Sequence, residues 1–104
     1  MQNSFIKEIL LASKAINDGR SRYAVLAKAG EEFGELAQEV MISEGDHYKK
    51  PGKDGVIGEA IDLMVCCTDL VYSIAPEITE EEMIEILKLK LHKWKTKSNK
   101  GILL

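Results

Sequence analysis

Hydrophobic residues recur every three or four positions in four separate segments of this chain, which is the spacing of amphipathic helices. The first segment covers about residues 4–17 and ends at the turn signal Asp18-Gly19. Ser21 is a suitable N-cap for a second helix that continues to about Glu44. The expected core stripe of this second helix is Leu26, Phe33, Leu36 and Val40, with Ala29 between them.

The third predicted helix, about residues 56–75, is apolar almost all round and stops before Pro76. A helix of this kind must be covered on several sides, and a chain of 104 residues offers few helices to cover it. We therefore expect an oligomer interface on this helix. Thr79 and Glu82 have the spacing of a capping box, which predicts the start of a fourth helix. Residues 45–55 contain three glycines and one proline and are expected to form a polar loop.

These elements predict one all-α domain over residues 1–104, a four-helix-bundle-like unit completed by oligomerisation. Hydrophobic residues make up 45% of the chain and charged residues 30%, which is ordinary for a globular protein. No apolar run is long enough to cross a bilayer, and Lys7 and Glu8 interrupt the first apolar stretch, so a secretory signal is not expected. We expect a cytoplasmic protein without a membrane partner. The net charge of −3 argues against binding to a nucleic acid polymer.

Two acidic motifs are the main candidates for chemistry. Glu32 and Glu35 stand three residues apart on the second helix, and Glu59 and Asp62 stand three apart on the third. Residues at this spacing lie near one face of a helix, and a carboxylate in the apolar third helix is costly unless something pairs with it. Two such helices side by side would place four carboxylates around one point, where a hard divalent cation is the natural partner.

Simpler roles are also open to acids in a helical protein. A buried salt bridge to a lysine would account for one acid but poorly for four. A di-iron bundle needs Glu-x-x-His motifs, and the residue three before His92 is Leu89, so the pattern is absent. The acids Glu80 to Glu82 lie at a helix start, where negative charge is favourable for local reasons.

Several residues near the acidic motifs are expected to be structural. Cys66 and Cys67 are adjacent in a helix and point in different directions, which favours small buried residues over a disulfide or a zinc site. Asp69 lies two turns beyond Asp62 and could extend the site, but a bond to a neighbouring helix is favoured. Glu39 is assigned a supporting or surface position.

The motif Glu31-Glu32-x-x-Glu35, followed after a loop by Glu59-x-x-Asp62, resembles the signature of the MazG-like all-α nucleoside triphosphate pyrophosphohydrolases. The resemblance covers about residues 24–70 as motif and most of the chain as architecture. It implies Mg²⁺, with Mn²⁺ as a possible substitute, held by Glu32, Glu35, Glu59 and Asp62. It also implies that Glu31 occupies an additional acidic position, where it could orient water or a second metal ion.

By the same resemblance, the chain would be a homodimer or homotetramer that cleaves a nucleoside triphosphate between the α and β phosphates, giving a monophosphate and pyrophosphate. Either Glu35 or Glu31 would accept the proton of the attacking water. The family often carries a set of basic residues and asparagine after the last helix. Lys93 and Lys97 stand in for this set here, and Lys53 of the loop could also hold pyrophosphate. The sequence does not identify the preferred base. Two alternatives are also open: a phosphoribosyl-ATP pyrophosphohydrolase and a non-enzymatic helical interaction module.

Overall fold

The computed structural model describes residues 4–16, 18–45 and 49–99, and within these residues every regular element is an α-helix. The helices are α1 (Phe5–Ile16), α2 (Arg22–Ser43), α3 (Gly55–Ile74) and α4 (Glu80–Asn99). The all-α class predicted from the sequence is therefore confirmed, and the helix bounds lie close to the predicted ones.

The helix ends follow from local side-chain chemistry. The hydroxyl of Ser21 accepts a hydrogen bond from the backbone N–H of Ala24 at 3.1 Å, so Ser21 caps α2 as predicted. The capping box of α4 is also present, because Thr79 Oγ1 accepts from the N–H of Glu82 at 3.1 Å and Glu82 Oε1 accepts from the N–H of Thr79 at 2.9 Å. Gly45 follows α2 with a φ of 81°, a left-handed conformation that favours glycine after a helix.

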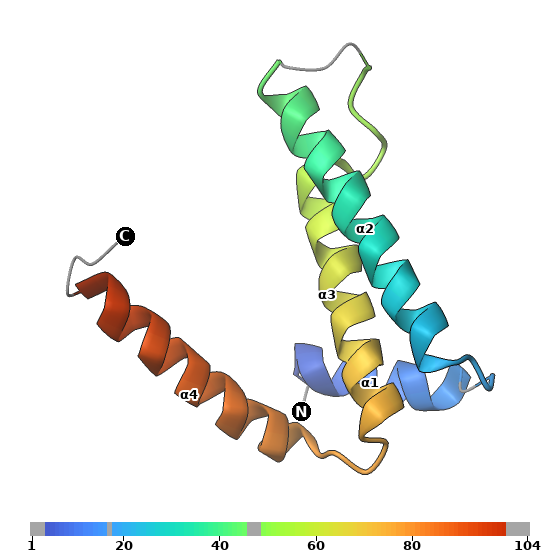
Figure 1. Cartoon of the computed structure of the whole chain (residues 1–104), viewed down its shortest axis with the longest axis vertical. Coiled ribbons are helices and arrows are strands. Elements are labelled where there is room, and N and C mark those ends of the chain that lie inside the picture. The colour runs from blue at the N-terminus through green and yellow to red at the C-terminus, as the bar shows by residue number, and fades with distance from the viewer. Residues whose placement is uncertain (1–3, 17, 46–48, 100–104) are drawn as a thin grey trace.

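Helices α2 and α3 run antiparallel and side by side, and α1 crosses the lower end of the pair (Figure 1). A polar contact fixes this crossing. The Ser13 hydroxyl donates to Asp69 Oδ1 at 2.7 Å, and Arg20 Nη1 lies 2.9 Å from Asp69 Oδ2. Asp69 of α3 thus joins α1 and the α1–α2 connection to α3, which makes it a structural residue.

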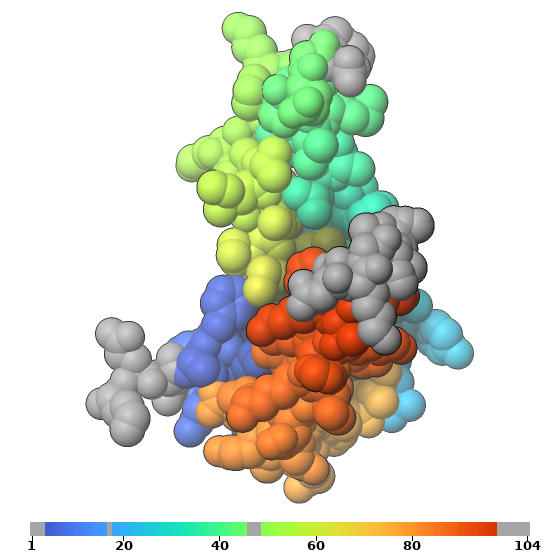
Figure 2. Space-filling model, turned by 90° about the vertical axis from the view of Figure 1, so that its left-hand side faces the viewer, coloured from blue at the N-terminus to red at the C-terminus, as the bar shows by residue number. Residues whose placement is uncertain are grey.

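Helix α4 lies apart from the α2–α3 pair (Figure 1). Within the described part of the chain it approaches α1 but neither α2 nor α3. The upper parts of α2 and α3, drawn in green, project beyond the other helices in Figure 2. The radius of gyration is 16.3 Å, whereas a compact chain of this length has about 13 Å. The four helices therefore do not close into a bundle within one chain.

The core stripe expected on α2 was wrong. The buried residues of α2 are Val25, Ala29, Glu32 and Glu39, and of the predicted stripe Ala29 alone is among them. Phe33 is 61% exposed, and Leu26 and Val40 also face outward. Helix α2 therefore turns a mixed face with two buried glutamates towards α3 and leaves its larger apolar side chains uncovered in the single chain.

Large apolar side chains are also uncovered on α3 and α4. None of the residues of α3 is fully buried. The exposed large hydrophobic residues of these two helices are Ile57, Ile61, Met64, Val65, Ile74, Ile86, Leu87, Leu89, Leu91 and Trp94. Despite these exposed apolar side chains, no helix of the described residues is both long enough and apolar enough to cross a membrane.

Candidate functional site

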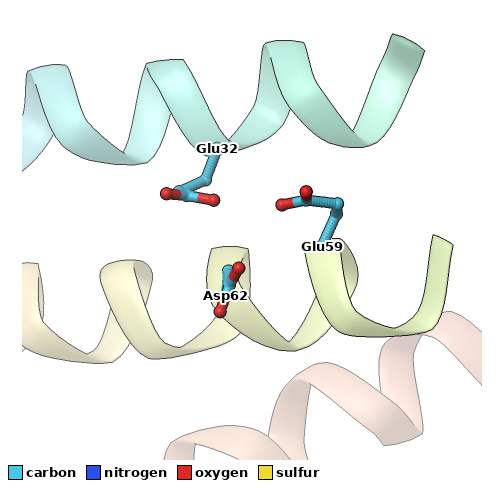
Figure 3. Close-up of side chains that lie close together, drawn as sticks. All are labelled: Glu32, Glu59 and Asp62. Carbon is cyan, nitrogen blue, oxygen red and sulfur yellow. The ribbon is translucent and has the colours of Figure 1, made fainter. Parts of the chain in front are cut away.

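Three carboxylates meet between α2 and α3. Glu32 comes from α2, and Glu59 and Asp62 come from α3, and one carboxylate oxygen of each lies within 4.8 Å of the others. Figure 3 shows Glu32 and Glu59 extending towards each other from facing helices, with Asp62 one turn along α3. The structure thus brings together three of the four metal ligands predicted from the sequence. We call this set the acidic trio.

Burial makes the acidic trio unusual. Glu32 is only 6% exposed. Within the described residues, its Oε2 atom and the Oε1 atom of Glu59 are buried without any hydrogen-bond partner. Buried polar oxygens are almost always paired, because an unpaired one loses its contacts with water and gains nothing in return. Two such oxygens in one cluster indicate that a positively charged group belongs between them.

The electrostatics of Glu59 support the same conclusion. Its pKa is raised from 4.5 to about 7, first by burial and then by the negative charges of Glu35, Asp62 and Glu32. Like charges at short range oppose ionisation of one another. A bound cation would reverse this balance and favour the ionised carboxylate.

One lysine already reaches the acidic trio, and it was not singled out from the sequence. Lys28 Nζ lies 3.3 Å from Glu32 Oε1, one helical turn away on α2, and this pairing raises the pKa of Lys28. A salt bridge between a lysine and a buried acid therefore exists, but it engages one oxygen of one acid. The second oxygen of Glu32 and the buried oxygen of Glu59 have no counterpart in the described chain.

The donors of the acidic trio fit a hard divalent cation. All three side chains offer carboxylate oxygens, which suit Mg²⁺, Ca²⁺ or Mn²⁺ better than softer metals. Mg²⁺ keeps several waters and commonly takes a few carboxylates together with substrate phosphates. Three carboxylates between two neighbouring helices match that requirement.

The other two predicted acids lie at the edge of the site. Glu35 is exposed and is not part of the acidic trio, although its charge contributes to the raised pKa of Glu59. Glu31 is also exposed, and its carboxylate lies 3.9 Å from Lys28 Nζ. Successive helix positions turn by about 100°, so Glu35 stands about 60° away from Glu32 around α2. This rotation places Glu35 beside the seam between α2 and α3 rather than within it.

The predicted phosphate-binding lysines are not gathered at the acidic trio within one chain. Lys53 is exposed in the loop before α3, and Lys93 and Lys97 are exposed on α4. Because α4 does not approach α2 or α3 in the described residues, its lysines lie away from the acids of the same chain. A role for Lys93 and Lys97 at the acidic trio would therefore require α4 of another copy of the chain.

Glu39 holds a loop in place and does not lie at the surface. It is buried, and its two carboxylate oxygens accept hydrogen bonds from the backbone N–H of Gly52 at 3.1 and 3.0 Å. A Cβ atom at position 52 would lie 2.9 Å from Glu39 Oε2, so a larger residue there would shift the end of the Glu39 side chain. Glu39 therefore fastens the loop that leads into α3 to the side of α2.

The fold and the site together define an all-α protein with a partly buried carboxylate cluster suited to a divalent cation. Comparisons with protein-family models, with curated proteins and with solved structures find no match for the chain.

Proposed function

We propose that the protein is a Mg²⁺-dependent nucleoside triphosphate pyrophosphohydrolase that cleaves between the α and β phosphates. The observation that carries this proposal is the pair of buried, unpartnered oxygens, Glu32 Oε2 and Glu59 Oε1, within the acidic trio of the described chain. A triphosphate brings negative charge of its own, so acids can hold it only through a cation. Mg²⁺, or Mn²⁺ in its place, is the cation that suits both sets of oxygens.

In this proposal the acids divide the work by position. Glu32, Glu59 and Asp62 hold the cation, which when bound neutralises charge on the phosphates. Glu35, exposed beside the seam, is placed to orient the attacking water and accept its proton, with Glu31 as the alternative. The water oxygen forms a bond to the α-phosphorus while the bond to the bridging oxygen of the β-phosphate breaks. The products are a nucleoside monophosphate and pyrophosphate.

The proposal includes a homodimer or homotetramer. Two observations support assembly: the exposed apolar residues on α2, α3 and α4, and the position of α4 away from the α2–α3 pair. Exposed apolar surface of this extent is typical of a protein–protein interface. A second copy would cover this surface and could bring Lys93 and Lys97 of its own α4 towards the phosphates, alongside Lys53.

The test is a substrate panel. Purified protein is incubated with each ribo- and deoxyribonucleoside triphosphate and with phosphoribosyl-ATP, in Mg²⁺ or Mn²⁺, and pyrophosphate release is measured. We expect release from at least one substrate, its loss in Glu59→Gln and Glu32→Gln, and its retention in Glu81→Gln as a surface control. Circular dichroism checks that the helices remain. An assembly that binds Mg²⁺ weakly and hydrolyses nothing would instead be a non-enzymatic interaction module, and the proposal would be rejected.

A further inference from the structure

A pocket with an apolar floor lies beside the acidic trio. It has a volume of about 370 Å³ and lies between α1 and α3. Ile9, Ala12 and Ile16 of α1 line one side, and Val65 and Cys66 of α3 line the other. Four charged side chains also line it, namely Glu8, Lys28 and the paired Arg20 and Asp69. A concave apolar surface with a few polar groups is the usual form of a small-molecule site.

The acidic trio does not line the pocket, but residues one helical turn away from it on α2 and α3 do. Lys28 lines the pocket, and its Nζ atom lies 3.3 Å from Glu32 Oε1. Cys66 lies one helical turn after Asp62 on α3, a rise of about 6 Å along the helix. Burial raises the pKa of the Cys66 thiol, and the negative charge of Glu32 raises it further.

A second pocket is larger, about 490 Å³, but its charged groups are already engaged. Arg20 lies against Asp18 and Asp69, and Arg22 Nε donates to the backbone carbonyl of Ser73 at 3.3 Å. These contacts hold α1, α2 and α3 together at the lower end of the fold. The cations that would attract a nucleotide there are occupied by structural partners.

We propose that the apolar pocket between α1 and α3 receives the nucleobase of the substrate whose phosphates are held at the acidic trio. This inference rests on the proposed function. The residues of the described chain that line the pocket include no aromatic ring, so the base packs against aliphatic side chains. The carboxylate of Glu8 also lines the pocket and can accept a hydrogen bond from the polar rim of a base.

The first experiment narrows the pocket and leaves the acidic trio unchanged. Val65→Trp places a large ring in the pocket, and Met64→Trp, at the neighbouring exposed position outside it, is the matched control. We expect Val65→Trp to raise the KM of the hydrolysed nucleotide at least tenfold. Inhibition by inorganic tripolyphosphate with Mg²⁺, which has no base, should stay within twofold of the wild type. Met64→Trp should change neither quantity.

The second experiment does not depend on turnover. In a Cys67→Ser background, Cys66 is labelled with a thiol reagent in the presence of Mg²⁺ and either a nucleoside triphosphate or tripolyphosphate. We expect the nucleotide to slow labelling at least fivefold and tripolyphosphate to have little effect. In Val65→Trp the protection by nucleotide should be lost.

The outcomes separate this inference from the proposed function. Hydrolysis with a wild-type KM in Val65→Trp and unprotected Cys66 would overturn the base pocket alone. Equal weakening of nucleotide and tripolyphosphate in Val65→Trp would also overturn it. Absence of hydrolysis with protection of Cys66 by nucleotide would reject the pyrophosphohydrolase and support the pocket. Absence of both would reject both.

Discussion

The chain carries two groups of neighbouring acids, and their surroundings are opposite. Glu80, Glu81 and Glu82 stand in the first turn of α4, and the only side-chain hydrogen bonds of this group in the described residues are those of the exposed capping box of Glu82 with Thr79. The acidic trio lies between two helices, with two buried oxygens that have no partner in the described chain. Glu81 and Glu82 are exposed, and the whole first group stands at the positive end of a helix dipole, so its charges are favourable without any ligand.

This difference teaches that acid density in a sequence is a poor guide to function. Three consecutive glutamates form the denser cluster, yet they have local reasons to be there. The acidic trio is spread over 31 positions, from Glu32 to Asp62, and becomes a cluster only through the pairing of α2 with α3. Uncompensated burial, rather than the number of carboxylates, separates a candidate site from a solvated helix start.

The largest expected difference between the two groups is in turnover. Asp62→Ala should lower kcat/KM for the hydrolysed nucleotide by at least about 100-fold, more than residues that only support a metal ligand commonly cost. Glu81→Ala should leave kcat/KM within twofold of the wild type. Steady-state pyrophosphate release measures both. Equal losses in the two variants would mean that the acidic trio has no special role.

The next difference is in metal-dependent stability. Mg²⁺ that binds the folded chain at 100 times its Kd should raise the free energy of unfolding by about 2.7 kcal/mol. Thermal unfolding with Mg²⁺ and after its removal with EDTA measures this change. Glu59→Gln should reduce the stabilisation sharply, while Glu81→Gln should keep it. Full stabilisation in Glu59→Gln would place the ion elsewhere.

A third difference concerns pH in the absence of metal. Because the pKa of Glu59 is about 7 in the folded chain against an ordinary 4.5, the folded state binds more protons than the unfolded state between these values. The stability from neutral Glu59 is thus complete below about pH 4.5 and is lost as the pH rises through 7.

Glu59→Gln imitates the neutral carboxyl at every pH. Its melting temperature should therefore match that of the wild type near pH 4.5 and exceed it at pH 8. Added Mg²⁺ should raise the melting temperature of the wild type at pH 8 and so remove this difference. Glu81→Gln should show no such gain at pH 8, because the ionised carboxylate of Glu81 is favourable at the start of α4. A gap for Glu59→Gln that does not change with pH would contradict the raised pKa.

The smallest effect belongs to the start of α4. Thr79→Ala removes the cap and should lower the free energy of unfolding by about 1 kcal/mol, without changing kcat/KM by more than twofold. Thr79→Ser keeps the hydroxyl and should retain most of the stability. Denaturant unfolding measures both variants. A large loss of turnover in Thr79→Ala would mean that the first turn of α4 contributes to catalysis, contrary to this prediction.

The helices were predictable because their signals are local. Ser21 caps α2, and Thr79 and Glu82 form the box before α4, as their types and spacing indicated. Asp69 was also expected to bond to a neighbouring helix, and it does so through Ser13. The two caps involve residues three positions apart, so the local sequence is enough to predict them. For Asp69, a carboxylate in an apolar helix indicates that a polar partner is needed, without saying which residue it is.

The inner face of α2 was not predictable in the same way. Counting apolar residues favoured Phe33 and Val40, but these face outward while Glu32 and Glu39 are buried. Hydrophobic periodicity identifies an apolar face without saying which neighbour covers it. When a helix has one neighbour within the chain and large uncovered side chains elsewhere, the apolar face can belong to an interface. The three-residue spacing likewise grouped Glu35 with Glu32, although the seven-residue spacing of Glu39 is closer in angle.

The contact between Glu39 and Gly52 has a consequence for the alignment of the site. Two antiparallel helices can slide along one another, and each step of one turn would carry Glu59 about 5.4 Å past Glu32. Because Glu39 accepts hydrogen bonds from the backbone just before α3, it limits this sliding and sets the position of α3 along α2. The carboxylate of Glu39 thus keeps Glu59 and Asp62 opposite Glu32.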